Sequence, residues 1–441
     1  MNILFLLTDN QRADLLGCAG NPVIQTPHLD HLAAHGTRFT NAFATTPICA
    51  ASRASFLTGC YERRHQFTFH TPPLRREFTA ASYPEILKSR DYRTGFIGKF
   101  GIGSDGIVPT VEGEDTLRRM FDHFDNYEHW MEDGYDIRQT DGTTRHLTDI
   151  TGDNVIAYLE SHARPETQPF CLSVSFNAPH AQDNDPRHYI WPETESDLYL
   201  DDTIPEPDNA DPTFFASLPE FIRESESRRR WHTRYDSPEN YQRNLKGLYR
   251  MISGVDRNVG RITQTLERLG LTEDTLIIFA SDHGMYYGDR GLSDCWQLND
   301  ASIRIPLIVF DPRHPQSAKV REEMALNIDV APTILDLCDL PIPPHTQGRS
   351  LRPLLEGNTT EWRSAFLCEH LFDRSDIPKS EGVRTERWKY IRYFEQRPIY
   401  EELYDLVSDP TESHNLAGQM DLAEKLDEMR LQCTDLCQRC S

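Results

Sequence analysis

The chain has 441 residues, of which 38% are hydrophobic, and its formal net charge is −23 at pH 7. This length can bury a large core, either as one big α/β domain or as one such domain with a smaller partner. The acidic charge argues against a nucleic-acid-binding protein, which would present a basic face, and an anionic substrate would need a local basic pocket that works against the overall field.

The chain begins with a short apolar run at 3–7 that has no basic residue before it. Such a run is typical of a buried strand and not of a secretory signal. No stretch of about 18 apolar residues occurs, so we expect no membrane span and no membrane partner. On the sequence as given we expect a cytoplasmic protein, or a periplasmic or secreted one if a signal peptide was removed before residue 1.

Apolar runs of strand length recur along the chain, and helical patterns lie between several of them. The predicted strands are 3–7, 94–97, 170–176, 276–280 and 305–310. The predicted helices are 27–35, 83–90, 152–163 and 244–269. Because the strands are continuously apolar and do not alternate, they predict an α/β fold with a doubly wound, mainly parallel sheet that is covered on both faces.

The later part of the chain has a different composition. Asp, Glu and Pro dominate 192–240, which we expect to be a long surface excursion without a core of its own. A Pro-rich stretch at 340–345 is followed by strand patterns at 388–393 and 402–406 and by a closing helix. We therefore predict an α/β domain over residues 1–345 and a C-terminal α+β subdomain over 346–441, with a small antiparallel sheet and a terminal helix.

Ten cysteines occur without regular spacing, which is typical of a reducing compartment and of buried free thiols. Cys433, Cys437 and Cys440 could suggest a metal site. They share the apolar face of the closing helix, however, and no fourth ligand is near. We expect these three cysteines to pack in a core.

Candidate metal ligands follow two of the predicted strands. Asp9 and Asn10 follow the first strand, and Asp282 and His283 follow the strand at 276–280. Sheets of this class bind ligands at the carboxyl ends of their strands, and hard divalent cations prefer carboxylate and amide oxygens and tolerate an imidazole. Each Asp alone could be a helix cap or a turn residue, but two such strand ends on either side of Cys49 indicate a metal site.

The segment 47–59 contains Cys49, Ala51 and Arg53 in a C-x-A-x-R frame and ends in L-T-G. It resembles the signature of the formylglycine-dependent (type I) sulfatases of the alkaline-phosphatase-like superfamily. Further blocks resemble this family in the same order: TDNQRAD (8–14), TPHLDHLAAHGTRFTNAF (26–43), IGKFGIG (97–103), SFNAPH (175–180), SDHG (281–284), SIRIPLIVF (302–310), ELYDL (402–406) and DPTESHNL (409–416). The resemblance implies a doubly wound sheet with a smaller C-terminal sheet, in agreement with the strand pattern.

By this resemblance, a formylglycine-generating enzyme or an anaerobic maturation enzyme converts Cys49 to formylglycine. The hydrate of that aldehyde attacks sulfur, and its second hydroxyl then expels sulfate, a step that a serine or a thiol cannot perform. Asp9, Asn10, Asp282 and His283, with the modified Cys49, would hold one divalent ion, for which Ca2+ is the family's usual choice and Mg2+ or Mn2+ are alternatives. Many members have a second Asp where this chain has Asn10, whose amide oxygen can still coordinate.

The resemblance also implies roles for three basic side chains. Arg53, one turn after Cys49 on a helix, would steady the hydrate and the metal. Lys99 would contact sulfate oxygens, and His180 would contact sulfate or protonate the leaving oxygen. The ordinary alternatives are a surface salt bridge for Arg53, a solvated Lys99 and a structural His180.

Two positions depart from the family pattern. Gly101 stands where many members have a His, and Cys295 stands where many have a Lys. The identity of the general acid therefore stays open, and a specialised substrate is favoured. Arg290, Trp296 and Gln297 lie near Cys295 in the sequence and could supply contacts to the leaving group or to a sugar. The remaining candidates near a substrate, each with a structural role as the alternative, are His70, His370, Phe372 and Arg384.

We predict hydrolysis of the sulfate ester of a small sulfated saccharide. One alternative is a phosphonate monoester or phosphodiester hydrolase of the same superfamily, which would share the metal and the nucleophile, although Lys99 and His180 together favour sulfate. A remote alternative is a non-catalytic glycan-binding protein that kept the fold. The intact set of metal-ligating and nucleophilic residues speaks against it.

Overall fold

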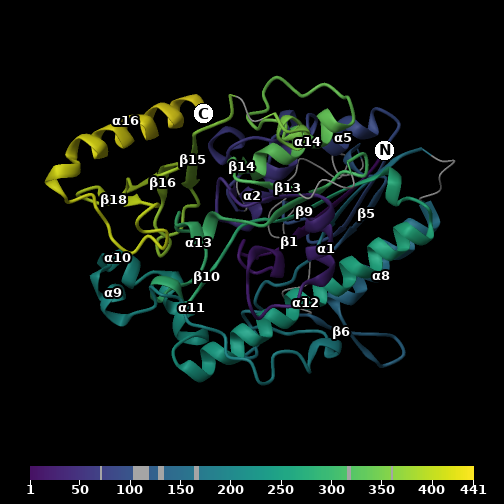
Figure 1. The fold of residues 1–441 in the computed structure, drawn as a ribbon, viewed down its shortest axis with the longest axis horizontal. Helices are drawn as coiled ribbons and strands as arrows, with labels where there is room; N and C mark the ends of the chain where they lie inside the picture. Colours follow the sequence, from purple (N-terminus) through teal and green to yellow (C-terminus); the bar gives the residue numbers. More distant parts are fainter. Residues whose placement is uncertain (70–71, 103–118, 128–133, 163–167, 315–318, 359–360) are drawn as a thin grey trace.

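The computed structural model describes residues 1–69, 72–102, 119–127, 134–162, 168–314, 319–358 and 361–441. An eight-stranded sheet forms its centre, in the order β13-β2-β12-β9-β1-β8-β4-β5 (Figure 1). One half of this sheet is parallel throughout: β9 (Thr275–Ser281), β1 (Asn2–Thr8), β8 (Phe170–Ser175), β4 (Arg93–Gly98) and β5 (His123–Asn126). The prediction of a mainly parallel sheet is confirmed.

The other edge of the sheet is mixed. β12 (Leu307–Phe310) runs antiparallel to β9 and to β2 (Thr37–Phe39), and β13 (Lys319–Arg321) is parallel to β2. The strand predicted at 305–310 begins only at Leu307. Pro306 has no N–H for the ladder, and the Ile305 N–H donates instead to the Ala42 carbonyl (2.9 Å).

The side chains of β1 alternate between two cores on opposite faces of the sheet. Leu4 and Leu6 enter one core, and Ile3, Phe5 and Leu7 enter the other. The first core is covered by α1 (Pro27–His35), α8 (Leu147–His162) and α12 (Pro238–Arg268). The second core is covered by α2 (Cys49–Thr58), α5 (Tyr83–Lys88) and α14 (Val330–Leu337) (Figure 1). None of the helices in the described ranges is both long enough and apolar enough to cross a membrane.

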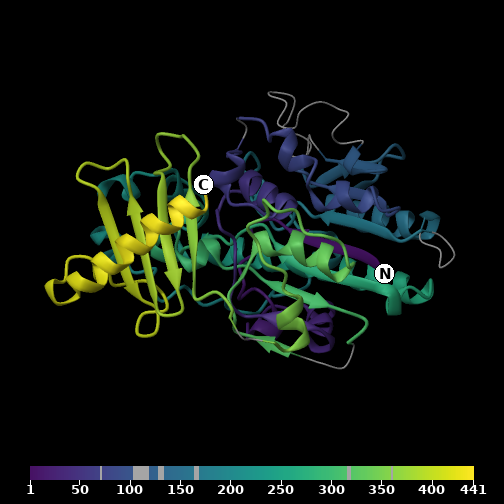
Figure 2. The same ribbon diagram turned by 90° about the horizontal axis from the view of Figure 1, so that it is seen from above.

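A separate antiparallel sheet forms near the C-terminus, and α16 (Ala423–Arg439) lies across it (Figure 2). Its strands are β15 (Ala365–His370), β16 (Ser380–Thr385), β17 (Trp388–Tyr393) and β18 (Tyr400–Asp405). Leu426 and Met429 of α16 pack in its core together with Cys433, Cys437 and Cys440. The predicted core packing of these cysteines is confirmed.

The segment between the two sheets packs with the larger one. Leu351, Leu354 and Leu355, at and within α15 (Arg352–Glu356), belong to the second core of the central sheet, and the C-terminal sheet starts at Ala365. The division predicted at residue 345 stays a prediction for the domain boundary.

The polar segment 192–240 is more than a surface excursion. It contains α9 (Pro212–Ser217), α10 (Glu220–Arg223) and α11 (Glu226–Arg234). Arg234 of α11 is only 1% exposed, because its guanidinium pairs with the carboxylates of Asp183 and Asp294. The surface prediction fails at Arg234, since a charged side chain can enter the interior when its charge is paired, whereas Arg229, His232 and Thr233 of the same helix are exposed.

His146, at the end of β7 (Thr144–His146), is buried. In its neutral form both ring nitrogens make a hydrogen bond. Its Nε2 donates to the Ile190 carbonyl (3.0 Å), and its Nδ1 accepts from the Thr148 N–H (3.2 Å). Burial lowers the pKa of His146 from 6.5 to about 4. Between these two pKa values the unfolded chain binds a proton that the folded chain does not, so the free energy of unfolding rises with pH.

We expect His146 to contribute about 2 kcal/mol to the increase in the free energy of unfolding between about pH 5 and about pH 6.5. Urea denaturation at the two pH values measures this difference. His146→Gln should reduce it by that amount, whereas the control His414→Gln, at an exposed position, should leave it unchanged. An identical pH dependence in both variants would contradict the assignment.

Candidate active site

Four strands of the central sheet bring predicted site residues to one edge. β1 and β9 are in register to their last residues, so Asp9 and Asp282, which follow them, leave the sheet side by side. β4 and β8 are also in register to their last residues; Lys99 follows β4, and His180 lies beyond β8. Parallel strands place their carboxyl ends at the same edge, and the topology therefore joins four distant parts of the chain there.

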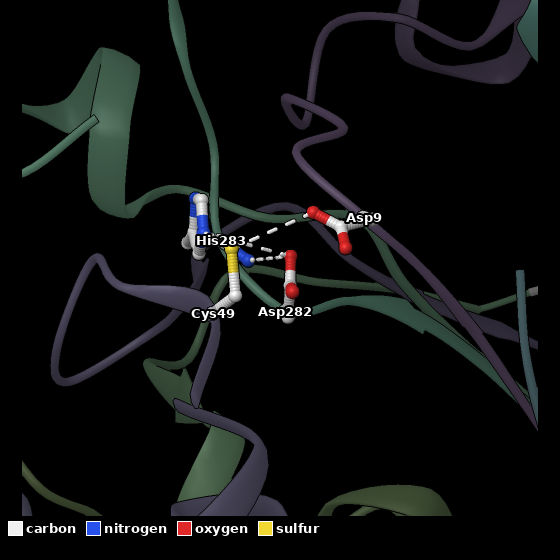
Figure 3. Close-up of side chains that lie close together, drawn as sticks. All are labelled: Asp9, Cys49, Asp282 and His283. Atoms are coloured by element: carbon white, nitrogen blue, oxygen red, sulfur yellow. Dashed lines mark hydrogen bonds and ion pairs between the residues drawn. The ribbon is translucent and has the colours of Figure 1, made fainter. Parts of the chain in front are cut away.

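The first residue of α2, Cys49, lies at this edge. The Cys49 Sγ atom is 3.6 Å from Asp9 Oδ1 and 3.2 Å from His283 Nε2. Figure 3 shows the side chains of Asp9, Cys49, Asp282 and His283 close together, with their polar ends facing one another. One turn into α2, the Ser52 hydroxyl donates to the Asp282 carbonyl (2.5 Å), which holds the helix against the end of β9.

The donor set at this edge fits a hard divalent cation. The candidate ligand atoms of Asp9, Cys49, Asp282 and His283 all lie within 4.8 Å of one another, and two ligands at calcium distances of about 2.3 to 2.6 Å can be at most about 5 Å apart. The amide oxygen of Asn10 lies 3.9 Å from Cys49 Sγ, next to the same point. Carboxylate and amide oxygens with one imidazole suit calcium, magnesium or manganese.

Backbone contacts orient these ligands. Asn10 has a left-handed backbone (φ 69°), and its N–H donates to Asp282 Oδ1 (3.0 Å). His283 Nδ1 donates to the Gly284 carbonyl (2.8 Å). A ring nitrogen fixed in this way turns the other nitrogen, Nε2, toward the site.

Arg53 joins the two carboxylates. Its Nε donates to Asp282 Oδ2 and its Nη2 to Asp9 Oδ2, each at 3.0 Å, and the side chain is 3% exposed. The Lys99 ammonium forms a further ion pair with Asp9. Burial alone would raise the pKa of Asp9, but the surrounding cations, Lys99 first among them, hold it well below its usual range. The Asp9 carboxylate is therefore ionised, as a metal ligand must be.

The Cys49 thiol is not prepared to act as a thiolate. Burial raises its pKa well above its usual range; the charge of Asp9 adds to this effect, and Lys99 opposes it. Cysteine nucleophiles react as thiolates. An unmodified Cys49 is therefore a weak nucleophile in this position.

His180 stands in the loop that follows β8. This loop is tied to the edge of the sheet because the Asp9 N–H donates to the Ala178 carbonyl (3.3 Å). His180 Nδ1 donates to the Ala181 carbonyl (2.6 Å). Burial lowers the pKa of His180, although Asp9 opposes this shift, so the ring is neutral at pH 7. A nearby anion would favour its protonated form.

The structure explains why Gly101 carries no side chain. A Cβ atom at Gly101, where φ is 70°, would come within 2.8 Å of Arg53 Cδ. Arg53 cannot move aside without losing its bonds to both carboxylates. Cys295, at the second position that departs from the family pattern, is buried beside His283. Burial would lower the pKa of His283, but Cys295 and the nearby carboxylates raise it to about 10; a bound cation would favour the neutral ring, the form that can act as a ligand.

Trp296 belongs to a small apolar cluster next to Cys49. The cluster consists of Ile48, Ala51, Cys295, Trp296 and Ile377, with Phe69 and Phe372 packed against it. The Trp296 backbone N–H donates to the Pro47 carbonyl (3.2 Å), which holds the tryptophan beside the segment that leads into α2. Two of the predicted substrate residues thus belong to an apolar cluster around the segment that carries Cys49: Trp296, which is 7% exposed, and Phe372, which is partly exposed.

Two predicted substrate residues, Arg290 and Arg384, have their contacts elsewhere. The guanidinium of Arg290 donates to the Glu412 carbonyl, and that of Arg384 lies 3.3 Å from the Asp300 carboxylate. These contacts join the central sheet to the C-terminal part of the chain. They explain why both arginines are buried, and they oppose the predicted contacts with a substrate.

Gln297 and His370 are also enclosed by protein. Gln297 is 3% exposed, and its amide exchanges hydrogen bonds with the Ser227 hydroxyl, which opposes a direct substrate contact. His370 is fully buried, and neither of its ring nitrogens has a hydrogen-bond partner within the described ranges. Burial, together with the charge of His283, lowers the pKa of His370 to about 3. His70 lies outside the described residues.

Sequence reasoning missed the contribution of α11. The guanidinium of Arg230 pairs with Asp294 (2.6 Å) and with Asp183 (2.9 Å), and it lies 5.3 Å from the centre of the Trp296 ring. Asp183 follows the His180 loop, and Asp294 stands two residues before Trp296. α11 therefore ties together two loops that border the site. The three consecutive arginines at 228–230 were the available signal.

Comparison with known proteins agrees with this geometry. A family model described as Sulfatase matches residues 1–340, and one described as N-sulphoglucosamine sulphohydrolase, C-terminal, matches residues 288–439. An N-acetylglucosamine-6-O-sulfatase of Bacteroides thetaiotaomicron is 27% identical, with 97% of this chain and 84% of the relative covered.

Solved structures share the whole fold. One is 25% identical with a TM-score of 0.84, covers 100% of this chain and 98% of its own, and is described as a complex with its substrate D-glucosamine-2-N,6-O-disulfate. A phosphonate monoester hydrolase of Agrobacterium radiobacter is 24% identical with a TM-score of 0.78, and 100% of this chain and 96% of that chain are covered. At that identity the second likeness shows the fold alone.

Proposed function

Because this chain belongs to the sulfatase family and is a sulfuric ester hydrolase, we propose that it removes sulfate from a small sulfated sugar with an oxygen nucleophile made from Cys49. One observation carries the proposal. Cys49 lies among Asp9, Asp282 and His283, where a divalent ion fits, and its thiol has a raised pKa that makes it a weak nucleophile. Its Sγ atom stands in for the oxygens of an aldehyde hydrate, which an oxidising maturation enzyme would supply.

The metal ligands, the two buried cations and His180 would each have a separate role in the reaction. A divalent ion held by Asp9, Asn10, Asp282 and His283 would supply Lewis-acid polarisation of a sulfate oxygen and would favour ionisation of the hydrate. Arg53 and Lys99 would offset negative charge on the sulfate oxygens in a buried site, where such contacts are strongest. His180 would become protonated when the anion approaches. It would then donate a hydrogen bond to the sulfate, or a proton to the sugar oxygen as the bond between that oxygen and sulfur breaks.

A sugar is supported as the group that carries the sulfate. The similar N-acetylglucosamine-6-O-sulfatase and the complex with D-glucosamine-2-N,6-O-disulfate both concern sulfated glucosamine. In this chain Phe69 and Phe372 are the partly exposed aromatic side chains of the apolar cluster that contains Ile48 and Ala51, on either side of Cys49. Aromatic side chains offer large apolar surfaces on which the carbon face of a sugar ring can rest. We propose a sulfated glucosamine as the first substrate to test.

Calcium is the ion that we propose, because it accepts more oxygen ligands from the protein, in a more flexible geometry, than magnesium does. The amide of Asn10 replaces one negative charge with a neutral oxygen, which lowers the charge of the ligand set. The positions of Arg53 and Lys99 on Asp9 further reduce the net negative charge around the ion.

Activity screening of the matured protein tests the proposed function. The protein is co-expressed with a formylglycine-generating enzyme and assayed with calcium on sulfated glucosamine mono- and disaccharides, with Cys49→Ala as the blank. Paired assays on an aryl sulfate and an aryl phosphodiester compare the two chemistries. We expect the sulfate esters to be hydrolysed faster. Faster phosphodiester hydrolysis would favour a phosphodiesterase. A protein that binds no metal and hydrolyses none of these substrates would favour a non-catalytic binding protein.

Lys99→Ala should lower kcat/KM by roughly 30- to 1,000-fold, because a charge-stabilising contact in a buried site contributes about 2 to 4 kcal/mol to transition-state stabilisation. Steady-state kinetics on the best sulfate ester measure this loss, and thermal unfolding checks that the variant is folded. Lys425→Ala, on the surface of α16, is the matched control and should change kcat/KM by less than about twofold. A loss below tenfold for Lys99→Ala would mean that Lys99 does not contact the sulfate.

A further inference from the structure

A polar cavity of about 390 Å³ lies apart from the Cys49 cluster. It is bordered by the loop 12–14, the end of β2, the start of β12 and residues 410–412. No residue of the proposed metal and sulfate site lines it. Its volume is within the range of small-molecule sites, about 300 to 1,000 Å³.

All four carboxylates that line this cavity are in ion pairs. Asp14 and Asp289 share Arg12 (2.6 and 2.8 Å). Asp300 and Glu412 share Lys389, which is fully buried behind them. Each carboxylate of the cavity is therefore in contact with a cation.

Two arginines of the cavity, in contrast, form no ion pair with a carboxylate of the described residues. The Arg38 side chain makes neither a hydrogen bond nor an ion pair within that part of the chain, although it lines the cavity. The Nε and Nη2 atoms of Arg304 both donate to the Thr40 carbonyl (2.8 and 2.6 Å), a neutral acceptor, and its charge acts on Asp14 and Asp300 without direct contact. Four arginines and four carboxylates line the cavity, so its charges are balanced in a chain of net charge −23.

A buried amide adds a third donor to the same cavity. Asn299 is 2% exposed, and its Oδ1 accepts a hydrogen bond from the Tyr286 hydroxyl (2.6 Å). Its Nδ2 has no hydrogen-bond partner within the described ranges. A buried donor in this state is unfavourable and would be stabilised by an acceptor placed next to it.

We propose that this cavity is an anion-binding site that takes a sulfate or carboxylate group. The donors on Arg38, Arg304 and Asn299, none of which is in an ion pair with a carboxylate of the described residues, fit an oxygen-rich anion. The anion is either free inorganic sulfate or a charged group of a saccharide. Apolar side chains on the cavity wall, among them Phe39 and Leu307, leave room for the carbon skeleton of the second.

Crystals of the protein soaked in selenate, an anomalous scatterer with the shape of sulfate, test this site directly. We expect an anomalous peak within hydrogen-bond distance of Arg38, Arg304 and Asn299, separate from any peak beside Cys49. Selenate beside Cys49 only, or in neither place, would overturn the proposal. Because the cavity shares no residue with the Cys49 cluster, the result does not depend on the proposed function.

Titration calorimetry with variants gives the second measurement. Arg38→Gln and Asn299→Asp, which keeps the acceptor for Tyr286, should each weaken this site at least tenfold and leave kcat on an aryl sulfate unchanged. Arg90→Gln, on an exposed residue outside the cavity, is the control. Inorganic sulfate and glucosamine-6-sulfate are compared as ligands, and tighter binding of either identifies the source of the anion. Equal affinity in the wild type and both cavity variants would overturn the proposal.

Discussion

Replacing Cys49 by alanine should lower kcat by roughly 10⁴- to 10⁶-fold, the range seen when the nucleophile of a covalent mechanism is removed. The fold should be unaffected, because Cys49 is the first residue of α2 and the Ser52 contact to Asp282 still holds the helix in place. Turnover of the best sulfate ester, measured on protein whose maturation is verified by mass spectrometry, gives the size of the loss. Substantial residual turnover would remove Cys49 from the role of nucleophile.

Cys49→Ser distinguishes an aldehyde hydrate from an ordinary hydroxyl nucleophile. Serine can attack sulfur once, but it has no second hydroxyl on the same carbon to expel the sulfate. We expect a burst of at most one equivalent of released alcohol per protein molecule, followed by no further turnover. Continued turnover by Cys49→Ser would show that the second hydroxyl is not needed.

Arg53→Met should destabilise the metal-free protein by about 3 to 5 kcal/mol, the cost of removing one partner from a buried ion pair. Asp9 and Asp282 are both fully buried, and Arg53 is the side chain that bonds to both. Urea denaturation in the presence of a chelator measures the loss. Calcium should recover part of it, because a bound cation replaces the missing positive charge.

A surface arginine is the control for this measurement. Arg187 is 56% exposed and pairs with Asp185, and Arg187→Met should change the free energy of unfolding by about 1 kcal/mol or less. Similar losses in the two variants would mean that Arg53 is not the main compensating charge of the buried carboxylates.

Much of the fold and of the metal cluster was predictable because both depend on local patterns. Continuous apolar runs identified β1, β8 and β9, and a strand end is where a parallel sheet exposes side chains to a ligand. Asp9 and Asp282 could therefore be placed together from the sequence. The register of β1 and β9, which ends both strands at the same edge, makes this juxtaposition geometrically necessary.

The surroundings of the cluster were less accessible to sequence reasoning. Arg230 and Arg234 lie in a charged segment whose sequence is typical of a solvent-exposed region. They are enclosed by protein because they form ion pairs with Asp183 and Asp294, which belong to distant loops. The contacts of Arg290 were also beyond sequence reasoning, because they come from a distant segment. Arg290 is near Trp296 in the sequence, but its guanidinium donates to the Glu412 carbonyl.

The most decisive measurement is a crystal structure of the matured protein with calcium. We predict one ion bound by oxygens of Asp9, Asn10 and Asp282 and by the Nε2 atom of His283, and an oxygen function in place of sulfur at residue 49. An ion bound elsewhere, or a catalytically active protein that still carries the Cys49 thiol, would show that the proposed site is wrong.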